Sequence, residues 1–119
     1  MTTAARGDLL WEPSEEAVER ATITRYRRWL EETRGLRLDD YAALWRWSVD
    51  DLEAFWSSIW EFGEVQAAAP YECVLGRREM PGAEWFPGAQ LNYAEHIFAR
   101  ARGSEPALVA RERRCARRS

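Results

Sequence analysis

Apolar positions recur at helical spacing from about residue 14 to residue 34. Ser14 precedes two acidic residues and suits a helix N-cap, since its hydroxyl can accept a free backbone N–H of the first turn. Gly35 supplies a left-handed residue that ends a helix. The residues that share one face are Ile23, Tyr26, Trp29, Leu30 and Thr33. The pattern predicts one long helix, or two helices with a kink near Thr22.

Two further helices are predicted between residues 39 and 63, a region that contains the Trp-rich stretch of residues 44–62. Asp39 and Asp40 can cap a short helix of at most two turns. Ser48 is expected to open the next helix, with Asp51 as an acidic variant of the capping box, and Gly63 to end it. Its apolar stripe consists of Leu52, Phe55, Trp56, Ile59 and Trp60. Aromatic stripes at this spacing predict a core or a domain interface.

The second half of the chain is less regular. Residues 71–76 have strand-like composition, which predicts a small hairpin or an edge strand. Asn92 can cap a last helix that Gly103 ends, and residues 106–110 resemble the first strand of a larger unit. The fold class is therefore mainly α: a small helical domain with a minor β hairpin or edge strand.

A chain of 119 residues accommodates one hydrophobic core. Residues 1–13 are predicted to be an extended lead-in, whose apolar patch Leu9–Trp11 packs on the domain. Residues 14–105 form the domain itself. Residues 106–119 begin a further unit and include an Arg-rich tail.

Composition and charge exclude several functional classes. Hydrophobic residues make up 46%, so the chain should fold. The net charge is −3, with an acidic body and a basic tail, which argues against a nucleic-acid partner. The longest uncharged run, residues 85–94, is too short for a membrane span, which needs about 20 apolar residues. Cys73 and Cys115 have no zinc or disulfide spacing, so we expect a cytoplasmic protein.

The sequence contains no catalytic, cofactor-binding or metal-binding pattern. His96 is the single histidine and lacks a nearby partner for a metal site or a triad, so it should be structural or exposed. Pairs of acidic residues lie at predicted helix ends, where capping and solvation explain them. The glycines are scattered, and all 17 basic residues are Arg. Without a Gly-rich loop or a Lys, the chain should bind no ATP.

Aromatic residues are numerous for so small a domain, with seven Trp, four Tyr and four Phe. Some of them should therefore require a partner surface. The candidate domain-docking residues are Trp11, Trp85, Phe86 and Leu91. Trp85 and Phe86 lie between two Pro-Gly turns, so this loop either contacts a partner or folds back onto its own helices.

Three stretches together resemble the start of acetoacetyl-CoA synthetases. They are LWEPS at residues 10–14, YAALWRWSVDDLEAFW at residues 41–56, and MPGAEWFPGAQLNYAEH at residues 80–96. The second and third are also similar to the broader acetyl-CoA synthetase N-terminal domain. The resemblance covers residues 9–110, nearly the whole chain.

The resemblance implies an AMP-forming acid–thiol ligase of lipid metabolism, which makes an acyl-adenylate from a carboxylic acid and ATP and transfers the acyl group to CoA. ATP, CoA and Mg²⁺ are implied for the full-length parent. Its catalytic parts lie downstream, so no catalytic residue is assigned to this chain. The chain is then expected to be a structural domain, inactive alone, that packs on a larger α/β adenylate-forming domain, of which residues 106–119 would be the start.

The Arg-rich ending departs from the family pattern, which suggests a truncated or frame-shifted reading from about Arg111 onward. The alternative function is a stand-alone helical module that binds another protein through its exposed aromatic residues.

Overall fold

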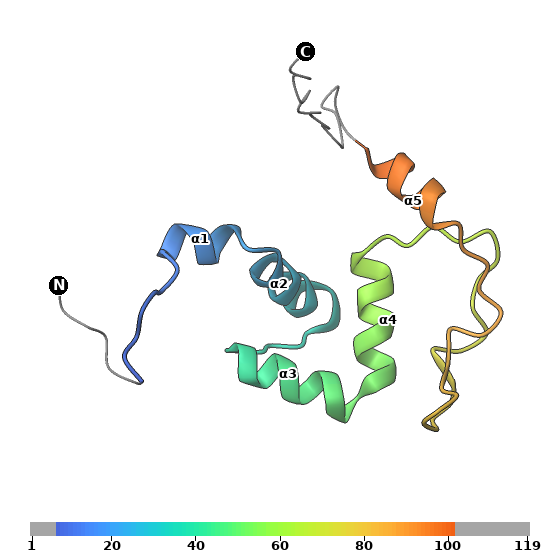
Figure 1. The fold of residues 1–119 in the computed structure, drawn as a ribbon, viewed down its shortest axis with the longest axis horizontal. Coiled ribbons are helices and arrows are strands. Elements are labelled where there is room, and N and C mark those ends of the chain that lie inside the picture. The colour runs from blue at the N-terminus through green and yellow to red at the C-terminus, as the bar shows by residue number, and fades with distance from the viewer. Residues whose placement is uncertain (1–6, 102–119) are drawn as a thin grey trace, which may run out of the picture.

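The computed structural model describes residues 7–101, which form five helices and one two-stranded hairpin (Figure 1). The elements are α1 (Glu15–Arg20), α2 (Thr22–Arg34), α3 (Tyr41–Asp50), α4 (Leu52–Phe62), β1 (Leu75–Arg77), β2 (Glu84–Trp85) and α5 (Tyr93–Arg100). The mainly helical class with a minor hairpin is confirmed. Within this part of the chain, no helix has the length and apolar character needed to cross a membrane.

The first two helices begin and end where the sequence places their signals. The Ser14 hydroxyl accepts the backbone N–H of Ala17 at 3.2 Å. Ala21 has extended torsion angles, which breaks the helix before Thr22, so the kinked alternative is the one observed. Gly35 ends α2 with φ of 62°, a conformation that glycine adopts without steric cost.

The boundary between α3 and α4 differs from the expectation. Helix α3 is 10 residues long and therefore exceeds two turns. Ser48 lies inside it and donates its hydroxyl to the Trp45 carbonyl at 2.7 Å. Asp51 caps α4 instead, by accepting the backbone N–H of Ala54 at 3.1 Å. The prediction that Ser48 opens α4 is wrong, because a carboxylate at a helix N-terminus gains from both the hydrogen bond and the helix dipole.

Helix α4 ends at Gly63, as predicted. Gly63 itself is right-handed, and the following residue, Glu64, takes the left-handed conformation at φ 45°. A Cβ at Gly63 would lie 2.8 Å from the Ile59 carbonyl oxygen. Glycine is therefore required here for a close backbone approach.

The core lies where α2, α3 and α4 meet. Leu30 is fully buried, and Tyr26 and Leu44 are nearly so. Around them pack Trp29, Leu38, Trp47, Phe55, Ile59 and Phe62. Ser58 is also buried and donates to the Phe55 carbonyl at 2.6 Å, so the Tyr26 hydroxyl must donate to the Ser58 oxygen. This arrangement satisfies both buried hydroxyl groups.

After α4, residues 67–77 run antiparallel to residues 84–91 and form an irregular ribbon. Strands β1 and β2 pair within it, which confirms the predicted hairpin. Further along, the Glu72 N–H donates to the Pro87 carbonyl at 2.9 Å, and the Ala68 N–H to the Gln90 carbonyl at 2.8 Å. The ribbon therefore brings the start of α5 back toward the end of α4.

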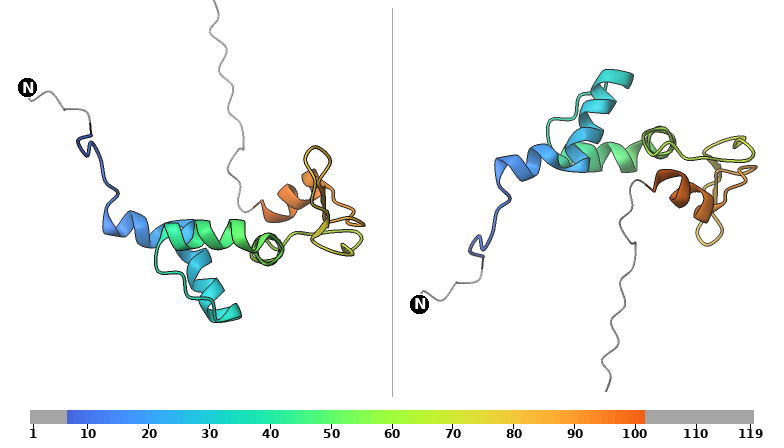
Figure 2. Two further views of the ribbon diagram at one scale, coloured as in Figure 1. Left: turned by 90° about the horizontal axis from the view of Figure 1, so that it is seen from below. Right: turned by 90° about the horizontal axis from the view of Figure 1, so that it is seen from above.

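The described residues do not form a compact unit. Their radius of gyration is 21.4 Å, whereas a compact domain of 100 residues has about 13 Å. Figure 2 shows the ribbon and α5 on one side of α4, and α1 with the lead-in at the other end. Few side chains are buried outside the three-helix core.

The lead-in over residues 7–13 has no helix or strand, as predicted. Its apolar patch is exposed, with Leu9, Leu10 and Trp11 between 76% and 80% accessible. The expectation that this patch packs on the domain is therefore wrong for this structure. Helix α5 ends at Arg100 and Ala101 is extended, so the prediction that Gly103 ends this helix is wrong. The strand at residues 106–110 and the Arg-rich tail lie outside the described residues.

The core predicts a large effect of truncating Leu30. Leu30→Ala should lower the free energy of unfolding by about 2–5 kcal/mol, because it leaves a cavity in a fully buried position. The measurement is urea unfolding followed by circular dichroism. Leu91→Ala, at a side chain that is 55% exposed, is the control and should change stability by no more than about 0.5 kcal/mol. Equal effects of the two changes would contradict this core.

Alkaline pH should also destabilise the core. Burial raises the pKa of the Tyr26 phenol, although the Ser58 hydrogen bond and the Arg34 charge partly oppose the rise. The contribution of Tyr26 is complete below the unfolded-state pKa of about 10 and is lost as the pH rises through the higher folded-state pKa. Urea midpoints measured from pH 8 to pH 11 should therefore fall. Tyr26→Phe should flatten this dependence, whereas Tyr93→Phe, at an exposed ring, should retain it.

Candidate domain-docking surface

Two polar contacts join α5 to the segment that follows α4. The backbone N–H of Gln66 donates to His96 Nδ1 at 3.4 Å, and Arg100 pairs with Glu64 at 2.8 Å. His96 thus has a structural contact, in agreement with the sequence interpretation. Over residues 7–101, no group of three or more His, Cys, Asp or Glu side chains is arranged to hold a metal ion.

The same helix carries an uncovered apolar face. Tyr93 and Phe98 are 81% and 77% exposed, and Ile97 is 47% exposed. Leu91, immediately before the helix, is exposed as well. These four residues are here called the α5 face. Because exposed apolar groups on one amphipathic face are unfavourable in water, such a face indicates a surface that another element covers.

The loop residues Trp85 and Phe86 lie against α4. The Trp85 ring packs on Trp56, with 5.6 Å between ring centroids. The Phe86 ring lies 4.8 Å from Trp60 and 5.1 Å from Tyr71. The side of α4 that carries Trp56 and Trp60 therefore packs against the ribbon. At Phe86 the loop therefore folds back onto its own helices, which is one of the two predicted alternatives. Trp85 stays partly exposed.

Phe86 adopts an unusual backbone conformation, with φ of 48°. A bulky residue in the left-handed region is strained, typically by about 1–2 kcal/mol. Its backbone N–H donates to the Val74 carbonyl at 2.9 Å, and its ring packs against both Trp60 and Tyr71. These contacts offset the strain and fix where the ribbon turns toward α5.

The four predicted docking residues do not form one patch. Trp11 lies in the lead-in beyond α1, at the opposite end from the ribbon and α5 (Figure 1). Leu91 borders α5, and Trp85 lies on the ribbon. Whether these residues contact another domain stays a prediction.

Tyr93, Ile97 and Phe98 were not among the docking residues predicted from the sequence. Their spacing in an amphipathic helix was the available signal. What the spacing could not indicate is that no other described element covers them.

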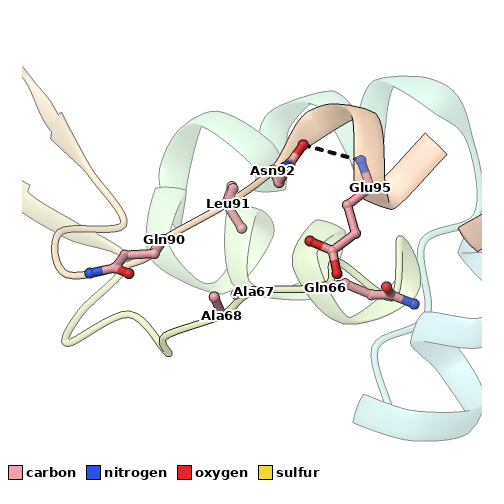
Figure 3. Close-up of a pocket in the computed structure, with 7 residues that line it drawn as sticks. All are labelled: Gln66, Ala67, Ala68, Gln90, Leu91, Asn92 and Glu95. Atoms are coloured by element: carbon pink, nitrogen blue, oxygen red, sulfur yellow. Dashed lines mark hydrogen bonds between the residues drawn. The ribbon is translucent and has the colours of Figure 1, made fainter. Parts of the chain in front are cut away.

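A shallow pocket of about 490 Å³ lies where the ribbon meets the start of α5 (Figure 3). Its lining residues are Gln66, Ala67, Ala68, Gln90, Leu91, Asn92 and Glu95. The Asn92 side chain accepts the Glu95 backbone N–H at 3.2 Å and so caps the helix. In Figure 3 the Glu95 carboxylate points toward Gln66, while the Gln90 amide points away. The pocket offers amide and carboxylate groups but no nucleophile paired with a base.

Comparison with known proteins agrees with this architecture. Residues 41–97 match the family model for the acetyl-coenzyme A synthetase N-terminus. The chain is 36% identical over 102 residues to the acetoacetyl-coenzyme A synthetase of Rhizobium meliloti and 34% identical over 109 residues to the acetoacetyl-CoA synthetase of Macaca fascicularis. These matches support an N-terminal part of an acetoacetyl-CoA synthetase. The chain corresponds to the N-terminal region, since the two matches cover 86% and 87% of this chain but 16% of each relative.

A solved structure supports the same assignment. The acetoacetyl-CoA synthetase of Streptomyces lividans superposes with a TM-score of 0.68 at 51% sequence identity. The match covers 73% of this chain and 14% of the Streptomyces enzyme. The chain thus spans about one-sixth of the length of the curated relatives that it matches. The family resemblance proposed from the three sequence stretches is confirmed.

The contrast between Phe86 and the α5 face gives a test within this N-terminal region. Phe86→Ala should lower the free energy of unfolding by about 1–3 kcal/mol, because it removes the ring that packs against Trp60 and Tyr71. Phe86→Gly should be less damaging than Phe86→Ala, since glycine tolerates the left-handed conformation.

Phe98→Ala is the matched control for the same unfolding measurement. Its ring is 77% exposed, so stability should change by no more than about 0.5 kcal/mol. A large loss of unfolding free energy for Phe98→Ala would contradict the assigned roles. So would a greater loss for Phe86→Gly than for Phe86→Ala.

Proposed function

We propose that this region is the non-catalytic N-terminal domain of an acetoacetate–CoA ligase and docks on the enzyme's downstream adenylate-forming domain. The parent would convert ATP, acetoacetate and CoA to acetoacetyl-CoA, AMP and pyrophosphate. The observation that carries the proposal is the match to acetoacetyl-CoA synthetases over a small N-terminal share of their length.

The α5 face is the proposed contact with the downstream domain. It presents Tyr93, Ile97 and Phe98 on a helix that the His96 and Arg100 contacts join to the segment after α4. Aromatic side chains that are already positioned lose little conformational freedom on binding and often dominate interface affinity. Leu91 and Trp85 would lie at the edge of this contact.

The chemistry would belong to the downstream domain. ATP, CoA and Mg²⁺ would bind there, because the present sequence has no Lys and no Gly-rich phosphate loop. The role of this region would be to shape and stabilise the large domain. We also propose a cytoplasmic location and a role in lipid metabolism for the parent. A stand-alone interaction module would use the same exposed residues, but the family match favours the ligase.

Reconstitution in two pieces tests the proposal. The Streptomyces lividans enzyme, shortened by the segment that this chain matches, is mixed with this chain, and acetoacetate-dependent pyrophosphate release is measured. This chain alone should show no activity, and the mixture should recover activity that the shortened enzyme lacks. The double variant Tyr93→Ala/Phe98→Ala should restore activity less efficiently. The concentration at which it restores half of the activity should be at least about tenfold higher than for the unchanged chain, as expected for loss of two aromatic interface residues.

Val49→Ala, an exposed apolar residue on α3, is the control and should behave as the unchanged chain. Pyrophosphate release by this chain alone would refute the non-catalytic role. Equal recovery with the control and with the double variant would refute docking through the α5 face.

A further inference from the structure

The pocket between the ribbon and α5 contains a carboxylate without a charged partner (Figure 3). Glu95, in the first turn of α5, is the one charged residue among those that line the pocket. Within the part of the chain that the structure describes, no ion pair involves Glu95. Arg100, on the same helix, is already paired with Glu64. The pocket therefore presents an unbalanced negative charge to whatever covers it.

Hydrogen bonds hold the walls of the pocket in place. The Gln90 carbonyl accepts the Ala68 N–H at 2.8 Å, and the Gln90 N–H donates to the Ala69 carbonyl at 3.3 Å. At the start of α5, the Asn92 side chain accepts the Glu95 backbone N–H at 3.2 Å. These bonds fix the backbone of the ribbon and of the first helical turn before anything binds. A ligand side chain would therefore enter a site that needs little ordering.

The lining residues suit a side chain with a cationic end and an apolar stem. The Glu95 carboxylate points toward Gln66, whose side-chain amide adds a second acceptor oxygen (Figure 3). Leu91, Ala67 and Ala68 add apolar surface. Arg and Lys carry several N–H donors on a hydrocarbon stem, so either can use both kinds of surface at once.

The pocket is continuous with the α5 face. Leu91 belongs to both. Phe98 follows Glu95 by three residues, so the two side chains are neighbours on the helix surface. A partner that covers the α5 face therefore also removes water from the Glu95 carboxylate, which is exposed in this structure. Because a carboxylate that loses water without gaining a partner opposes binding, the covering surface must supply a positive charge at this point.

We propose that Glu95 pairs with one Arg or Lys side chain of the downstream adenylate-forming domain, which enters the pocket beside the α5 face. The cationic end binds the Glu95 carboxylate, and the stem lies on Leu91. This pairing rests on the docking proposed above and adds a charge requirement to it. The apolar α5 face supplies most of the affinity, whereas the charge pair fixes the orientation of the two surfaces.

Neutralising Glu95 tests the pairing in the two-piece reconstitution. Glu95→Gln removes the charge but keeps the size of the side chain, and should raise the chain concentration needed for half-recovery by roughly threefold to tenfold. Glu95→Arg should raise it further, since like charges oppose docking. Glu53→Gln is the matched control, because Glu53 occupies the first turn of α4 as Glu95 does that of α5. The control should behave as the unchanged chain.

Salt dependence distinguishes a charge pair from a structural role of Glu95. Raising NaCl from about 0.05 M to about 0.5 M should increase the half-recovery concentration more steeply for the unchanged chain than for Glu95→Gln, because salt screens charge pairs. Equal salt dependence of these two chains would overturn the pairing, as would equal half-recovery concentrations for Glu95→Gln and Glu53→Gln.

The two proposals fail in different ways. If Glu95→Gln matches its control while Tyr93→Ala/Phe98→Ala still restores activity poorly, docking through the α5 face stands and the charge pair is refuted. If the unchanged chain restores no activity to the shortened enzyme, both proposals are refuted.

Discussion

Helix α4 is packed on two sides, and the rest of the structure depends on this packing. On one side, Phe55, Ile59 and Phe62 contact the core formed with α2 and α3. On the other, Trp56 and Trp60 hold the ribbon through ring contacts with Trp85 and Phe86. Without this helix, the three-helix core and the ribbon would have no common support, and α5 would lose the segment that orients it.

The open shape has a physical explanation. A region of this size can bury few side chains by itself, and its aromatic residues exceed what its own core accommodates. The surplus is distributed over the α5 face, the exposed rings of Tyr41 and Trp45 on α3, and the lead-in. The curated relatives are about six times longer than the matched region, so in those proteins other parts of the chain are available to cover such surfaces.

Helix ends show why parts of the fold could be predicted. Ser14, Asp40, Asn92 and Gly35 act through hydrogen bonds or torsion angles within one helical turn, so the sequence alone located them. Ser48 was misassigned because two capping residues competed within a few positions, and only the geometry of the α3–α4 corner favoured Asp51.

The sequence by itself determined the family, the helical class, the hairpin and the lack of a recognisable catalytic pattern, because these depend on local spacing and on residue types. Tertiary structure decided which aromatic residues pack against other parts of the chain and which stay exposed. Phe86 is held against Trp60 and Tyr71, whereas Phe98 and Trp11 remain uncovered, although all are apolar in sequence. The reason is that exposure depends on contacts between segments far apart in the chain, which spacing along one segment does not specify.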